Sequence, residues 1–162
     1  MNDGGFQELR AIEASIWNEL LRCTTERHHA WRRCVLATVD GDRADARIIV
    51  LRECSRTERT LTFFTDERSP KVHQILANPH GTLVLWSEAL SWQLRLAVRL
   101  ELVANGLAVS SRWARLKLTP GAQDYLSPLP PGTAVAQPLP ERGTREYFAV
   151  ITATIEIGRA HV

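Results

Sequence analysis

The sequence predicts a mainly β protein of the α+β class, a small antiparallel barrel with helices at its periphery. Three observations support this fold. Residues 92–103 alternate between apolar and polar side chains, turn signals separate short apolar runs, and few helical patterns lie between those runs. A parallel sheet would need crossover connections between its strands, and the sequence offers too few helices to supply them.

The chain begins with a predicted helix over residues 6–26. Its apolar side chains recur at spacings of three and four, which places them on one helix face. They are Phe6, Leu9, Ile12, Ile16, Leu20 and Cys23. At 162 residues the chain can bury a core of its own. We therefore expect a single domain over residues 1–162, with the N-terminal helix inside residues 1–30.

Six strands are expected, at residues 34–39, 44–52, 60–65, 82–86, 92–103 and 146–157. Asp40-Gly41 favours a tight hairpin turn between the first two strands. The second strand contains four successive aliphatic residues, Ile48 to Leu51, and such a run predicts a strand covered on both faces. A polar loop over residues 53–59 is expected to lead to the third strand.

Two shorter helices are expected, at residues 70–77 and 110–118. The segment 123–143 contains five prolines, which disfavour both helix and central strand. Tyr125 and Leu126 give this segment apolar side chains to bury, so we predict an ordered extended loop.

Composition narrows the function classes. The formal net charge is +2, which is too small to indicate nucleic acid or an anionic membrane as a partner. No apolar run approaches the roughly 20 residues that span a bilayer. The three cysteines, Cys23, Cys34 and Cys54, form no disulfide framework and predict reduced thiols in a cytoplasmic protein. The histidines show no metal-ligand spacing, and we predict no metal site.

The stretch Ser69-Pro70-Lys71 opens a predicted helix and has two interpretations. Serine suits the N-cap and proline the first helical position, so plain helix capping explains both. Lys71 fits capping poorly, because a cation in the first turn opposes the helix dipole. A phosphate at this helix start would instead use the free N–H groups, the Ser69 hydroxyl and the Lys71 ammonium. The residues alone leave both interpretations open.

Three other polar residues fit a bound nucleotide. Arg47 and Arg52 flank the aliphatic run, about 16 Å apart along an extended strand, which is comparable to a mononucleotide. Gln93 begins the alternating strand, and its amide can both donate to and accept from a heterocycle. Taken alone, each of these residues fits an ordinary solvated side chain better than a ligand site.

Four segments together resemble the pyridoxamine 5'-phosphate oxidase-like FMN-binding split-barrel family. They are "RIIVLR" (Arg47–Arg52), "FFT" (Phe63–Thr65), "SPKVHQILANP" (Ser69–Pro79) and "LSWQLRLAV" (Leu90–Val98). They occur in the family's order and at its spacing. The resemblance implies a six-stranded antiparallel split β-barrel and a homodimer with FMN at the subunit interface.

The resemblance also implies a set of FMN-binding residues. Arg47 and Lys71 would hold the phosphate, with hydroxyl contacts from Thr65 and Ser69. The strand between the two arginines would lie along FMN, and Gln93 would reach the flavin ring. Phe64 stands where the family has tyrosine, and Arg52 would lie near the reactive end of the flavin. The strand residues concerned are Arg47, Ile48, Ile49, Val50, Leu51 and Arg52.

The function implied is an FMN-dependent oxidoreductase with no catalytic acid or base indicated. Trp113 and Lys117 stand in the region where pyridoxamine phosphate oxidases have a tyrosine and an arginine for the substrate phosphate. The resemblance is therefore to a separate branch of the family. The alternative is a flavin- or haem-binding barrel without turnover, and a haem would need His73 or His161 as its axial ligand.

Overall fold

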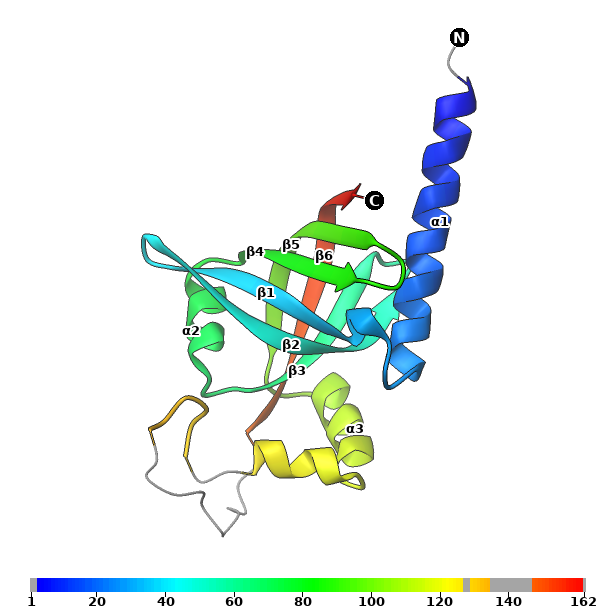
Figure 1. Cartoon of the computed structure of the whole chain (residues 1–162). Coiled ribbons are helices and arrows are strands. Elements are labelled where there is room, and N and C mark those ends of the chain that lie inside the picture. The colour runs from blue at the N-terminus through cyan, green and yellow to red at the C-terminus, as the bar shows by residue number, and fades with distance from the viewer. Residues whose placement is uncertain (1–2, 127–128, 135–146, 162) are drawn as a thin grey trace.

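Six strands form a closed antiparallel barrel with the neighbour order β1-β2-β3-β6-β5-β4 (Figure 1). The structure, a computed structural model, describes residues 3–126, 129–134 and 147–161. The strands are β1 (Arg33–Asp40), β2 (Arg43–Ser55), β3 (Thr60–Asp66), β4 (His80–Ser87), β5 (Trp92–Val103) and β6 (Phe148–His161). The predicted fold class is confirmed, including the number of strands.

The helices lie outside the barrel (Figure 1). They are α1 (Asp3–Thr25), α2 (Pro70–Ala77) and α3 (Leu107–Leu116), with short 3-10 helices η1 (Ala30–Arg32) and η2 (Pro120–Tyr125). The sequence did not reveal η1 and η2, because three to six residues carry too little periodicity. Residues 123–125 were expected to begin the proline-rich loop, but they form the second half of η2. Most of the predicted proline-rich loop lies outside the described residues.

Two strands, β2 and β6, continue three or more residues beyond their predicted C-terminal ends. β2 continues through the expected loop to Ser55, because Glu53 and Cys54 pair with Thr62 and Leu61 of β3. A bulge between Leu51 and Glu53 shifts the register at this point. β6 extends to His161, since its last residues pair with the start of β5. Pairing partners that are distant in sequence thus extend both strands beyond their local patterns.

The barrel interior is filled by large aliphatic and aromatic side chains. Those with almost no exposed surface include Leu36, Leu51, Leu61, Phe63, Leu83, Leu85, Leu94 and Ile151. Burial of one such side chain contributes roughly 1.5–3 kcal/mol. The C-terminal half of α1 covers this core with Trp17 and Leu20, while its N-terminal half extends past the barrel (Figure 1).

The aliphatic run in β2 is not covered on both faces, so that prediction was wrong for the single chain. Ile49 and Leu51 face the core, whereas Ile48 is 69% exposed and Val50 is half-buried. The reason is the period of two in a strand, which turns Ile48 and Val50 to the outer surface. Trp86 and Ile157 add exposed apolar surface to the outer side of the barrel.

A second apolar cluster lies outside β3 and β6. α3 and η2 place Trp113 and Tyr125 against Phe148 of β6, with ring centroids 5.4 Å apart in both pairs. Arg112 of α3 ties this cluster to β2 through an ion pair with Glu53 at 2.7 Å. Trp113 is therefore a packing residue in this structure, whereas Lys117 lies exposed at the end of α3.

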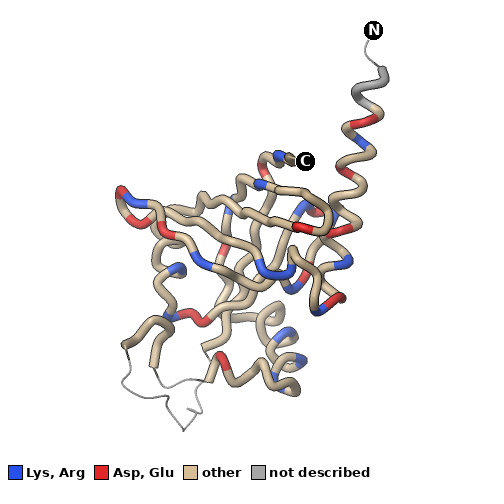
Figure 2. The backbone as a smooth tube through the Cα atoms, viewed as in Figure 1, with Lys and Arg blue, Asp and Glu red and all other residues tan. Residues whose placement is uncertain are grey.

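Charged residues of both signs are interspersed along the backbone (Figure 2). Within the described part of the chain, no helix is both long and apolar enough to cross a membrane.

Candidate functional site: a cationic cradle between β3 and α2

The turn from β3 to α2 brings three predicted site residues together. The Lys71 ammonium donates hydrogen bonds to Thr65 Oγ1 at 3.2 Å and to Ser69 Oγ at 3.0 Å. The two hydroxyl oxygens lie 3.3 Å apart. Both hydroxyl residues are buried, and Lys71 is partly buried. We call Thr65, Ser69 and Lys71, together with Arg47, the cradle.

The Ser69 side chain does not cap α2. Ser69 occupies the N-cap position, but its hydroxyl makes no hydrogen bond to a helix N–H group. The Val72 N–H is instead bonded to the Ser69 carbonyl at 2.9 Å. The hydroxyl points to Lys71 and Thr65. Plain capping is therefore insufficient to explain why a serine and a lysine stand at this helix start.

Arg47 is held at the end of the barrel by a polar network. Its guanidinium donates to Gln74 Oε1 at 2.8 Å, to Thr38 Oγ1 and to the Asp45 carboxylate. The Gln74 amide also donates to Asp45 at 2.9 Å. Thr38 and Gln74 are buried, so this network fixes the arginine rather than leaving it in solvent.

Sequence reasoning missed Thr38, Asp45 and Gln74. Thr38 continues the inward alternation of Cys34 and Leu36 in β1, and Gln74 lies on the buried face of α2. A polar residue on an otherwise buried face was the available signal. The Gln74 hydrogen bond is the largest influence that lowers the pKa of Asp45, and the charge of Arg47 adds to it.

The electrostatics of the cradle favour an anion. Burial lowers the pKa of Lys71, and the positive charge of Arg47 lowers it further, while Asp66 acts in the opposite direction. Asp66 is already paired with Arg68 at 2.7 Å. Among the described residues, no carboxylate lies within ion-pair distance of the Lys71 ammonium. A partly buried cation beside a second cation is stabilised when an anion such as phosphate binds between them.

The other predicted residues lie outside the cradle. Arg52 places its guanidinium 5.6 Å from the ring centroid of Phe64, which packs on Phe148. Gln93 is half-buried and lies between Trp86 of β4 and His161 of β6 in the strand register. Within the described structure, neither Arg52 nor Gln93 forms a hydrogen bond with a cradle residue.

The side chains of β2, the strand predicted to lie along FMN, alternate between the barrel interior and the outer face. Ile49 and Leu51 are enclosed in the barrel, so only Ile48 and Val50 could border a ligand on the outer face. The histidines considered as haem ligands, His73 and His161, are exposed on different elements. Within the described residues, no three His, Cys, Asp or Glu side chains gather as a metal site would require.

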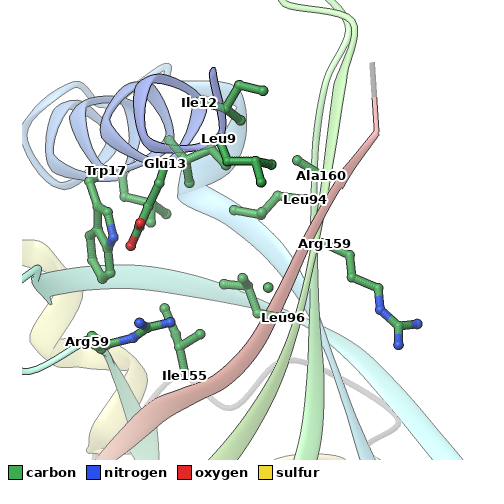
Figure 3. Close-up of a pocket in the computed structure, with 13 residues that line it drawn as sticks. Leu9, Ile12, Glu13, Trp17, Arg59, Leu94, Leu96, Ile155, Arg159 and Ala160 are labelled. Carbon is green, nitrogen blue, oxygen red and sulfur yellow. The ribbon is translucent and has the colours of Figure 1, made fainter. Parts of the chain in front are cut away.

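A different hollow, of about 410 Å³, lies between α1 and the strands β5 and β6 (Figure 3). Figure 3 shows Leu94, Leu96 and Ile155 facing Leu9 and Trp17 of the helix. Its walls are mainly apolar, so this hollow does not suit a phosphate.

Comparison with known proteins decides the family. A family model described as "Pyridoxamine 5'-phosphate oxidase, FMN-binding domain" matches residues 14–104, more than half of the chain. The chain belongs to this family. All four cradle residues lie inside the matched region, as do Arg52 and Gln93.

The curated relatives match only part of this chain. A pyridoxine/pyridoxamine 5'-phosphate oxidase from Pseudomonas putida (strain W619) is 41% identical over 69 residues. That match covers 42% of this chain and only 31% of the oxidase, and the chain spans about a third of the other curated relatives it matches.

Solved structures of the family share the barrel. A pyridoxamine 5'-phosphate oxidase-related, FMN binding protein from Nostoc punctiforme superposes with a TM-score of 0.73, covering 90% of this chain and 82% of that one. A putative pyridoxamine 5'-phosphate oxidase from Listeria innocua gives 0.60, covering 92% and 97%. Their sequence identities of 20% and 19% show a common fold and nothing narrower.

Proposed function

We propose that this protein binds FMN and that the cradle holds the FMN phosphate. The observation that carries the proposal is the convergence of the Lys71 ammonium and two buried hydroxyl groups at the start of α2. Arg47 supplies a second positive charge, held in place by Gln74. Two cations, two hydroxyl groups and a helix N-terminus form the set of groups that a phosphate monoester dianion prefers.

The rest of the cofactor would follow the outer face of β2. Ile48 and Val50 would contact the flavin side, and Arg52 would lie toward its far end. Gln93 would offer its amide to the edge of the ring system. Bound FMN supplies hydride-transfer chemistry, and the protein would supply orientation and positive charge. We therefore propose an FMN-dependent oxidoreductase of cytoplasmic location, in keeping with three free cysteines.

A homodimer is part of the same proposal. Ile48, Trp86 and Ile157 expose 69%, 54% and 56% of their surface on the outer side of the barrel. A second copy would cover such apolar side chains and shield a flavin that lies over Ile48. Sedimentation of the FMN-loaded protein should show a dimer, whereas a folded monomer with full FMN occupancy would contradict this part of the proposal.

The visible spectrum tests FMN binding most directly. Purified protein should be yellow, or should take up added FMN at a ratio of one per chain. Anaerobic addition of NAD(P)H or pyridoxamine 5'-phosphate then tests for turnover, because an oxidoreductase should lose its flavin colour with at least one donor. Protein that remains colourless with excess FMN would refute the proposal. A flavin that no donor reduces would support a carrier instead of an enzyme.

A further inference from the structure

The apolar hollow between α1 and the strands β5 and β6 contains charged groups of both signs (Figure 3). Its volume of about 410 Å³ falls within the range of small-molecule sites. The charged residues along its walls are Glu13, Arg59 and Arg159. Figure 3 shows the Arg159 side chain turned away from the hollow, so Glu13 and Arg59 supply its charges. We infer that this hollow binds a free amino acid with a large apolar side chain.

The apolar walls come from the inner face of the strands and one face of α1. Leu94 and Leu96 are buried on β5, and Gly158 of β6 is paired with Leu96. A Cβ atom at Gly158 would lie 3.3 Å from Leu96 Cδ2, so the glycine leaves space that a larger residue would occupy. On the helix side, Leu9 remains 65% exposed although it faces these strands. An apolar ligand group would therefore cover surface that the chain by itself leaves in water.

Arg59 is held at the edge of the hollow by the turn between β2 and β3. Its backbone has a φ of 55°, in the left-handed region, where glycine would fit at lower cost. Its carbonyl oxygen accepts from the Ile155 N–H at 2.9 Å, which fixes the turn against β6. Non-glycine residues with such backbone angles cluster at functional sites. The guanidinium of Arg59 thus extends from a fixed backbone position beside the apolar walls.

Glu13 presents the opposite charge from α1. Figure 3 shows its carboxylate and the Arg59 guanidinium extending to the side of the hollow that Trp17 borders. Among the described residues, neither side chain forms an ion pair, with the other or with a third residue. Each group can therefore accept a ligand group of opposite charge.

The two charges decide between classes of apolar ligand. A fatty acid would pair with Arg59 but would be repelled by Glu13, and an apolar amine would meet the converse. An α-amino acid carries a carboxylate and an ammonium group on the same carbon, so it can pair with both residues. Its side chain would then lie against Leu94 and Leu96. Leucine and the aromatic amino acids have side chains of the required kind.

The amino-acid site is separate from the cradle. No cradle residue lines this hollow, and no residue of the hollow belongs to the strand that would lie along FMN. The inference therefore goes beyond the proposed function and does not depend on it.

Isothermal calorimetry of the whole chain with L-phenylalanine, in excess FMN, tests the site. Phenylpropionate lacks the ammonium group and phenethylamine lacks the carboxylate, so each should bind about three- to tenfold more weakly. Arg59→Gln should weaken L-phenylalanine by a similar factor without weakening phenethylamine. Glu13→Gln should weaken L-phenylalanine and strengthen phenylpropionate. Arg56→Gln removes an exposed charge of the same turn outside the hollow, and it should change each affinity by less than about twofold.

The outcomes separate this inference from the proposed function. L-Phenylalanine that gives no saturable heat, or that binds equally well to Arg59→Gln and Glu13→Gln, would overturn the amino-acid site. Decanoate that binds more tightly than L-phenylalanine would overturn the choice of ligand. An oligomer that Leu9→Lys dissociates would assign the hollow to a second copy of the chain and overturn it too. FMN affinity, measured by fluorescence quenching, should be the same in all these variants, and a parent protein that binds no FMN would count only against the cradle.

Discussion

The substitution Lys71→Met should separate FMN binding from stability. The ammonium would make a charge-assisted hydrogen bond to the FMN phosphate, and such bonds contribute about 1.5–3 kcal/mol. Loss of this interaction corresponds to a roughly 10- to 150-fold weaker FMN affinity. Without FMN, Lys71 is partly desolvated and repelled by Arg47. We therefore expect the FMN-free variant to be as stable as the parent protein or slightly more stable.

The assay is FMN titration by fluorescence quenching, combined with chemical denaturation of the FMN-free protein. Lys117→Met is the matched control, because Lys117 is exposed at the end of α3 and forms no hydrogen bond or ion pair with a cradle residue in the described structure. This control should leave both quantities unchanged. The role of Lys71 in phosphate binding would be refuted if Lys71→Met left the FMN affinity unchanged and made the FMN-free protein less stable. Lys71 would then serve only to stabilise the start of α2.

Three further predictions concern the cradle and its support. The pKa of Lys71 is lowered below its ordinary value of 10.5, and FMN affinity should fall as the pH rises through this pKa. The reason is that a deprotonated Lys71 must take up a proton before it can pair with the phosphate. Lys71→Arg should remove this fall, because arginine stays protonated. The unfolded chain keeps the Lys71 proton to higher pH, so FMN-free stability should rise over the same interval. Ser69→Ala should lower FMN affinity but change FMN-free stability by less than about 0.5 kcal/mol in urea denaturation, whereas a true N-cap loses about 1 kcal/mol. Gln74→Leu should destabilise the FMN-free protein by about 1–3 kcal/mol, because Thr38 and Arg47 lose a buried partner, and an unchanged urea midpoint would contradict the network.

The elements that the sequence predicts well have strong local signals. The alternation in residues 92–103 defines β5 to the residue, and the serine and proline before residue 71 define the start of α2. Local signals of this kind depend only on backbone geometry and solvent exposure within one element. They also bring Thr65, Ser69 and Lys71 together, because these residues are separated by only one short turn.

The features that the sequence does not predict depend on distant partners. Gln74 supports Arg47 across 27 positions of the chain, and neither residue carries a local sign of the other. The exposure of Ile48 depends on which face of β2 meets the core. The four successive aliphatic residues show no alternation, so the sequence does not indicate which face that is. Arg52 lies in the bulge between Leu51 and Glu53, which forms where β2 pairs with β3. Register, rather than composition, decides each of these cases.

The hydroxyl groups beside Lys71 have a consequence for the rate of ligand binding. A hydroxyl oxygen can accept from the ammonium while its own proton rotates toward a new acceptor. Thr65 and Ser69 could therefore turn their protons to an arriving phosphate without moving a heavy atom. Phosphate capture would then require only rotation about two C–O bonds, which is fast compared with loop or domain motion. Association should be limited by diffusion and electrostatic steering and not by a conformational change.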